Sequence, residues 1–176
     1  MRFKVLAVLA SICAAFAASA VFGQEQVQKP WAIKVGVLRP DSTAWRDESR
    51  DYWFLGGLDY TFRVAPDGSE NIGSLEYGSG RYGNRMWSLQ GLYRLRGYAN
   101  GEKTSATYYG AGFGIYSAKV KTADDLEDTV TRPGIPILAG VDLSGGMFVE
   151  LKYHFVFGKS LGRRLSGFTM AVGYKF

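Results

Sequence analysis

His154 is the only histidine of the chain, and imidazole is the side chain best suited to acid–base chemistry near neutral pH. A serine-type deacylase needs such a histidine within hydrogen-bond reach of a serine nucleophile, on a face that its lipid substrate can reach. In a strand, the neighbours that share a face with His154 are Lys152 and Val156, and neither is a nucleophile. An acyltransferase pattern is not visible either. We therefore predict no enzymatic activity, no catalytic residue and no cofactor.

Four carboxylates lie close together in the segment KTADDLEDT: Asp124, Asp125, Glu127 and Asp128. Carboxylate oxygens bind divalent cations, but a dedicated calcium loop also has a glycine and regularly spaced oxygen ligands. This segment lacks both. We expect a solvated acidic loop and no metal site.

Apolar and polar side chains alternate through most of the chain after residue 30. This alternation indicates β-strands, so we expect strands to hold the residues named above. There is no convincing amphipathic helix. The alternation is weakest in the third segment, so both a regular and an irregular strand fit there. The eight segments are residues 31–39, 51–64, 72–79, 86–98, 104–117, 134–144, 147–157 and 168–176.

The connections alternate between tight turns and longer loops. APDGSE, ANGEK and SGG are short, whereas residues 40–50, 80–85, 118–133 and the segment GKSLGRR are longer. An up-and-down antiparallel barrel places alternate connections at opposite ends, and barrels of outer membranes have short turns on one side and long loops on the other. With an even number of strands, both termini lie at the short-turn end.

The apolar face of the strands is predicted to face lipid, although a soluble barrel would bury the same face. Many glycines share the charged face, as a crowded, narrow lumen requires. Most strands have about the 9–11 residues that a tilted strand needs to cross a bilayer. Aromatic residues form two girdles, as at two membrane interfaces: Trp31, Tyr60, Phe62, Tyr93, Tyr109, Tyr174 and Phe176 near the short turns, and Tyr52, Phe54, Tyr77, Trp87, Phe155, Phe157 and Phe168 near the long loops.

The charged face then lines a lumen that side chains fill, because an eight-stranded barrel has no room for a wide pore. We expect its charges to pair across the barrel as a structural network. The alternative is that they line a gated, narrow ion path. The predicted network comprises Lys34, Asp59, Arg63, Glu76, Arg94, Arg96, Asp142, Glu150, Lys152 and His154.

The N-terminal segment has the features of a signal peptide. Arg2 and Lys4 precede the apolar, Ala-rich stretch VLAVLASICAAFAASAVFG, and small residues follow where a signal peptidase cuts. Cleavage after Ala20 or after Gly23 fits, and a membrane-anchoring helix is the alternative. We predict residues 1–23 as the signal peptide and 24–176 as the barrel. Cys13, the single cysteine, leaves with the signal, so no disulfide is expected.

The charge balance does not favour nucleic acid as a partner. The whole chain has 21 basic and 16 acidic residues, and loss of the two basic residues of the signal leaves 19 against 16. This excess is too small for a nucleic-acid-binding surface.

The export signal, the eight alternating strands, the Gly-aromatic strand YGAGFGIY and the end AVGYKF resemble the small outer-membrane β-barrels of the OmpA and OmpX type. The resemblance covers the mature chain and implies an all-β, eight-stranded antiparallel up-and-down transmembrane barrel in the cell outer membrane. It also implies that the barrel assembly machinery reads the last strand through Met170, Val172, Tyr174 and Phe176. We expect no peptidoglycan-binding domain after Phe176.

The resemblance and the charge pattern imply a monomer with a structural or surface-interaction role, in contact with outer-membrane lipid. GKSLGRR follows the seventh strand, where lipopolysaccharide phosphates would lie, and could contact them through Lys159, Arg163 and Arg164. Two alternatives remain: a narrow channel or carrier for small hydrophobic molecules, and a secreted soluble ligand-binding barrel.

Overall fold

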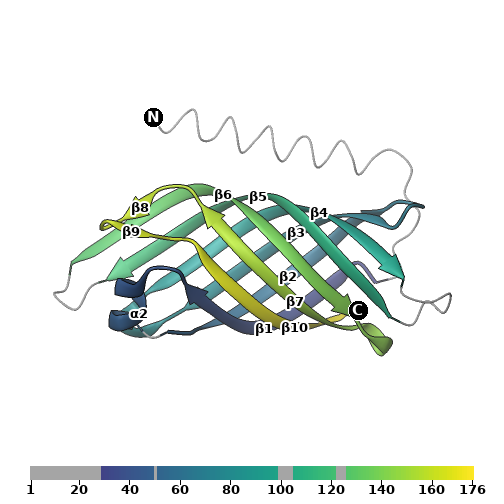
Figure 1. Cartoon of the computed structure of the whole chain (residues 1–176), viewed down its shortest axis with the longest axis horizontal. Coiled ribbons are helices and arrows are strands. Elements are labelled where there is room, and N and C mark those ends of the chain that lie inside the picture. Colours follow the sequence, from purple (N-terminus) through teal and green to yellow (C-terminus); the bar gives the residue numbers. More distant parts are fainter. Residues whose placement is uncertain (1–28, 50, 99–104, 122–125) are drawn as a thin grey trace.

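The computed structural model describes residues 29–49, 51–98, 105–121 and 126–176. Eight strands form one closed antiparallel sheet in which each strand pairs with its neighbours along the chain (Figure 1). The predicted signal peptide, residues 1–23, lies outside the described residues. The barrel strands are β1 (Trp31–Pro40), β2 (Trp53–Val64), β3 (Ser69–Ser79), β4 (Arg85–Tyr98), β5 (Ala106–Lys121), β6 (Glu127–Asp142), β7 (Met147–Val156) and β10 (Gly167–Lys175).

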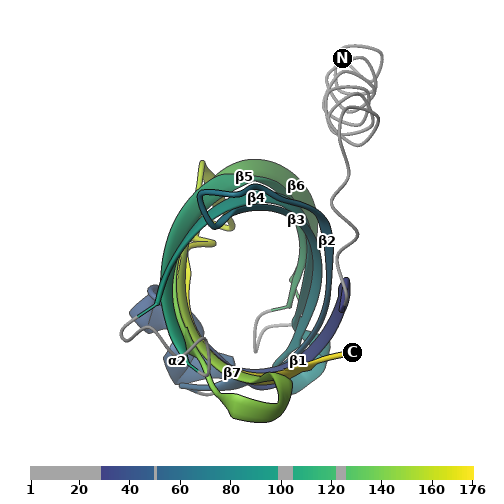
Figure 2. The same ribbon diagram turned by 90° about the vertical axis from the view of Figure 1, so that its right-hand side faces the viewer.

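The seam between β1 and β10 closes the barrel. Trp31 and Phe176 exchange two backbone hydrogen bonds, with N···O distances of 3.3 and 2.8 Å. From there β1 pairs with β10 as far as Pro40 opposite Gly167. Figure 2 looks along the barrel and shows the ring without a break. Because the first and last strands satisfy each other's backbone hydrogen bonds, neither is left as an open edge of the sheet.

Side chains alternate between the lumen and the outer surface, and the apolar set points outward as predicted. On β1, Ile33 and Val35 are both 52% exposed, whereas Lys34 and Leu38 are 2% exposed. The same division holds around the sheet, where Leu75, Leu89, Tyr109, Phe113, Leu151 and Met170 are exposed large apolar residues. A band of apolar side chains therefore surrounds the barrel, and a bilayer would solvate it.

The two ends of the barrel differ. The end that we name the turn end carries the start of β1, the C-terminus and the one-turn segment η2 (Ser144–Gly146) (Figure 1). The opposite end, the loop end, carries α2 (Thr43–Ser49), η1 (Arg81–Gly83) and a small hairpin of β8 (Lys159–Ser160) and β9 (Arg163–Arg164). Within the described ranges, no helix is long and apolar enough to cross a bilayer.

Three expectations from the sequence need correction. Residues 40–50 contain α2, a helix of seven residues, which is too short to show a helical period in the sequence. Its Arg46 holds the loop by donating from Nη1 to the carbonyl oxygens of Pro40 (3.0 Å) and Asp41 (2.8 Å). The segment 118–133 is mostly strand, because β5 continues to Lys121 and β6 begins at Glu127. The third strand is regular over 11 residues.

Neighbouring glycines on β2 test the assignment of the two faces. A Cβ on Gly57 would lie 2.8 Å from Lys34 Cε in the lumen, whereas a Cβ on outward-facing Gly56 meets its nearest atom, in Phe54, at 3.9 Å. We predict that Gly57→Leu lowers the free energy of unfolding by about 1–3 kcal/mol or more, because overpacking forces neighbours from their places. Gly56→Leu should leave it nearly unchanged. The urea midpoint in lipid vesicles, followed by tryptophan emission, measures both; equal midpoints for the two variants would contradict the assignment.

Candidate functional site: the filled lumen

Two lysines and three carboxylates form a network at mid-height in the lumen. Lys34 Nζ lies 3.0 Å from Asp59 Oδ1, 2.8 Å from Glu76 Oε1 and 3.2 Å from Glu150 Oε1. Lys152 Nζ lies 2.6 Å from Glu76 Oε1 and 3.3 Å from Glu150 Oε1. The five residues come from β1, β2, β3 and β7, and the pairs Lys34–Glu76, Lys34–Glu150 and Lys152–Glu76 connect strands that are not neighbours in the sheet.

Neutral polar groups complete this central network. Gln90 Nε2 donates to Glu76 Oε2 (2.8 Å) and to Ser88 Oγ (2.7 Å), and Lys152 donates to Gln90 Oε1 (3.3 Å). Lys34 also donates to Ser74 Oγ (3.3 Å). Burying ions is unfavourable unless the pairing geometry is good and further hydrogen bonds satisfy the remaining donors and acceptors. This arrangement meets much of that requirement.

A second charged cluster lies nearer the turn end. Arg94 and Arg96 both pair with Glu70, and Arg96 also lies 2.8 Å from Asp142. Asp142 in turn accepts from Lys175 Nζ at 2.7 Å. The pairs thus run from β3 through β4 and β6 to β10 and cross the lumen. The network predicted from the sequence lacks Glu70, because Glu70 is the last residue of the predicted connection APDGSE.

The prediction for Arg63 is wrong, because its side chain is exposed on the outer surface rather than in the lumen. The register of β2 against β3 shifts between Thr61 and Arg63, where Phe62 is the extra residue of a β-bulge. A bulge inverts the facing of every later residue in the strand. Strict alternation, from which Arg63 was assigned to the lumen, does not hold beyond this point.

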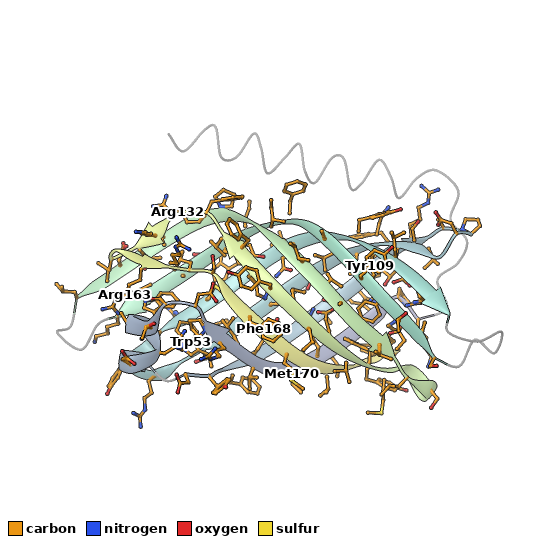
Figure 3. All side chains as sticks on the ribbon, viewed as in Figure 1. Trp53, Tyr109, Arg132, Arg163, Phe168 and Met170 are labelled. Atoms are coloured by element: carbon orange, nitrogen blue, oxygen red, sulfur yellow. The ribbon has the colours of Figure 1, made fainter. Side chains whose placement is uncertain are left out.

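The lumen is apolar toward the loop end, whereas the alternation in the sequence predicts a charged lumen face. Trp45 of α2 is 3% exposed and stacks on Trp53 of β2, with ring centroids 5.1 Å apart and planes 25° from parallel. Around this pair the lumen is closed by Leu38, Leu55, Met86, Tyr116, Ala118, Val120, Val156, Leu165 and Ala171. We name this group the apolar plug. Figure 3 shows Trp53 in the loop-end half of the barrel.

His154 lies between the central network and the apolar plug and has no exposed surface. Its Nδ1 lies 3.2 Å from Tyr116 Oη, and its Nε2 lies 3.3 Å from Thr169 Oγ1 and 3.6 Å from Glu76 Oε2. In a catalytic triad the acid and the nucleophile contact opposite ring nitrogens. Here the hydroxyl of Thr169 and the carboxylate of Glu76 share Nε2, and the hydroxyl at Nδ1 is the phenol of Tyr116, so no serine or threonine nucleophile lies opposite the acid.

The sequence-based expectation of no metal site concerns residues that are only partly described. Asp124 and Asp125 lie outside the described residues. In the rest of the chain that the structure describes, no three His, Cys, Asp or Glu side chains are grouped so as to hold a metal ion.

The remaining predicted residues lie on the outside of the barrel. Met170, Val172, Tyr174 and Phe176 point outward along the last strand and are 45–51% exposed. Lys159 and Arg164 are exposed and lie opposite each other in the β8–β9 hairpin, beside partly exposed Arg163. In Figure 3, Arg163 and Arg132 lie together at the loop end, whereas Met170 lies on the wall.

The central network predicts a strong effect of removing one cation. Lys152→Met leaves Glu76 and Glu150 short of a partner and should lower the free energy of unfolding by about 3–5 kcal/mol. Adding Glu76→Gln should restore part of the loss. Lys159→Met, at an exposed site, should stay within about 0.5 kcal/mol of the wild type. Urea unfolding measures all three; a Lys152→Met midpoint equal to that of Lys159→Met would show that the network does not stabilise the barrel.

Comparisons with known proteins support the same architecture. Neither a comparison with protein-family models nor one with curated proteins finds a match. Among solved structures, Neisserial surface protein A (NspA) superimposes with a TM-score of 0.59 at 13% identity, over 83% of this chain and 96% of NspA. The N-terminal β-barrel domain of Pseudomonas aeruginosa OprF gives 0.53 at 16%, over 86% of this chain and 100% of that domain. The outer membrane enzyme PagL gives 0.57 at 12%, over 82% and 98%.

At these identities the likeness is one of fold and carries no residue roles. It joins three independent observations: a closed sheet of eight antiparallel strands, an apolar outer band and a lumen filled by side chains. By its fold, the chain is a small eight-stranded β-barrel of the outer-membrane type.

Proposed function

We propose that the chain is a non-conducting, non-enzymatic monomer of the cell outer membrane that acts through its loop end. Short turns face the periplasm in such barrels, so the loop end would face the outside. The observation that carries the proposal is the filled lumen. Lys152 has no exposed side-chain surface, and Trp45 and Trp53 close the barrel above it.

This filling argues against a channel or a carrier that uses the lumen. An ion entering from the turn end would meet the paired charges of the central network, and above these the apolar plug carries no charged side chain. Both layers would have to rearrange for an ion to pass. The alternative of a secreted soluble barrel conflicts with the outer band, because it would expose many large apolar side chains to water.

An enzymatic role finds no support in the geometry around His154. PagL is an outer membrane enzyme of the same fold, but a fold does not carry its activity to another chain. His154 is enclosed, and a lipid on the outer surface could not reach it without opening the barrel.

The β8–β9 hairpin is the best candidate for contact with lipopolysaccharide. Lys159 and Arg164 present two cations side by side, and a Cβ on Gly158 would lie 3.2 Å from Arg132 Nε, so a third cation lies beside the hairpin. Arginine and lysine bind phosphate through charge-assisted hydrogen bonds. The outward residues of β10, Met170, Val172 and Tyr174, together with Phe176 directly after the strand, would serve the assembly machinery before the membrane covers them.

Conductance in a planar bilayer tests the closed lumen. We predict no unitary current steps for the wild type, and none for Trp45→Ala, because the central network remains beneath the apolar plug. Steady steps in the wild type would contradict the proposal. Steps only in Trp45→Ala would instead identify α2 as the gate of a narrow path.

Lipopolysaccharide binding tests the hairpin. The double variant Lys159→Gln/Arg164→Gln should lose most of the rise in unfolding temperature that lipopolysaccharide gives the wild type in detergent, because the binding of a ligand to the folded state stabilises it. Lys159→Arg/Arg164→Lys, which keeps both charges, is the matched control. An equal rise in both double variants would exclude the hairpin as the contact.

A further inference from the structure

The outer wall carries one groove that the filled lumen does not explain. It has a volume of about 570 Å³ and lies over β3, β4, β5 and β6. Among its lining residues, Gly91 and Ala111 have small or absent side chains, and Tyr93, Tyr109 and Phe113 are larger. Tyr109 and Phe113 are 64% and 70% exposed, so they stand out from the wall. This volume falls within the range of about 300–1,000 Å³ that is usual for ligand sites.

The register explains why the groove forms here. Gly91 pairs with Phe113 on one side and with Gly73 on the other, and Tyr93 pairs with Ala111. Small residues therefore alternate with large aromatic ones across neighbouring strands. An apolar chain lying over Gly91 would contact Phe113 on the β5 side and Tyr93 further along β4.

The groove ends at a polar corner near the turn end. Asn71 lines it, and Asn71 is the cross-strand partner of Arg63. The β-bulge at Phe62 turns Arg63 outward, where its side chain is exposed. Directly opposed side chains in a sheet have Cβ atoms about 4.5–5.5 Å apart, so the guanidinium can reach the mouth of the groove.

Asp67 is the nearby group of opposite charge. It lies in the β2–β3 turn, and its Oδ1 accepts from the backbone N–H of Ser69 at 2.9 Å. This hydrogen bond lowers the pKa of Asp67, and the charge of Arg63 acts in the same direction. The Asp67 carboxylate is thus engaged within its turn, while the exposed guanidinium of Arg63 can bind a further anion.

The direction of the groove matches the orientation of a lipid. Arg63 is within a few residues of the turn end, and Figure 3 shows Tyr109 in the turn-end half of the barrel. From Tyr109 to Phe113 the strand rises roughly 13 Å at about 3.3 Å per residue. The polar corner would therefore lie at the membrane interface, with the apolar walls extending into the hydrocarbon.

We propose that this groove holds one acyl chain of an anionic glycerophospholipid from the periplasmic leaflet, with its phosphate on Arg63 and Asn71. The proposal rests on the membrane placement given above but not on the closed lumen. It gives the bulge a role, since strict alternation would have left Arg63 facing the lumen, away from lipid.

Native mass spectrometry of the full mature barrel, released from detergent micelles, tests the site. The micelles contain phosphatidylglycerol, diacylglycerol with the same chains, or inorganic phosphate without lipid. We expect a one-to-one adduct with phosphatidylglycerol only. Arg63→Gln should lower its fraction about fivefold to tenfold, since a charge-assisted arginine–phosphate contact is removed. Gly91→Leu, which fills the floor of the groove, should do the same.

Arg85→Gln is the matched control, because Arg85 is an exposed arginine on β4 at the loop end. Equal adducts in Arg63→Gln and Arg85→Gln, or equal retention of diacylglycerol by the wild type, would overturn the proposal. So would a dimer mass that Gly91→Leu abolishes, because a second copy would then occupy the groove. The lipid panel on the wild type decides even where a variant does not fold. The closed lumen is tested by conductance and the lipid groove by mass spectrometry, so either proposal can fail without the other.

Discussion

The pairing of the first strand with the last is the constraint from which the other features follow. Hydrocarbon offers no partner to a backbone N–H or C=O, so a sheet in a bilayer must close on itself. Here Trp31 and Phe176 exchange backbone hydrogen bonds and the seam continues along the full length of β1. Closure with only eight strands leaves a narrow lumen. Every inward side chain must then fit against its counterparts across the barrel, while every outward one meets lipid.

The lumen satisfies that requirement in two different ways along its length. Toward the turn end and at mid-height it is filled by ion pairs and amide hydrogen bonds, centred on Lys34 and Lys152, and by a small apolar cluster of Ile72, Leu92, Tyr108 and Leu138. Toward the loop end it is filled as a soluble protein core is filled, by Trp45, Trp53 and the apolar residues around them. The strands β5 and β6, of 16 residues each, exceed the length needed to cross a bilayer. The apolar plug lies at the loop end, in the part of the barrel that extends beyond the bilayer toward water.

Much of this architecture could be predicted from the sequence, because the side-chain period of a strand is a local property. The eight strands, their outward faces and the lumen charges from Lys34 to Lys152 follow from alternation. Arg63 could not be placed, because nothing in the residues around Phe62 marks a bulge. The apolar plug did leave a signal: Tyr52, Trp53, Phe54 and Leu55 are all apolar, and such a run indicates a strand that is apolar on both faces, here with Trp53 and Leu55 inward and Tyr52 and Phe54 outward. α2 left none, because a helix of seven residues, about two turns, is too short to show a period.

The central claim is that the apolar face meets lipid and the charged face fills the lumen. The most direct test is to fractionate cells that express the chain and to run the membrane and soluble fractions on SDS gels, with and without boiling. The account predicts that the protein is in the outer-membrane fraction and that boiling changes its mobility, since a closed barrel resists SDS until heated. A soluble protein with the same mobility under both conditions would contradict it, and the apolar face would then line an interior cavity.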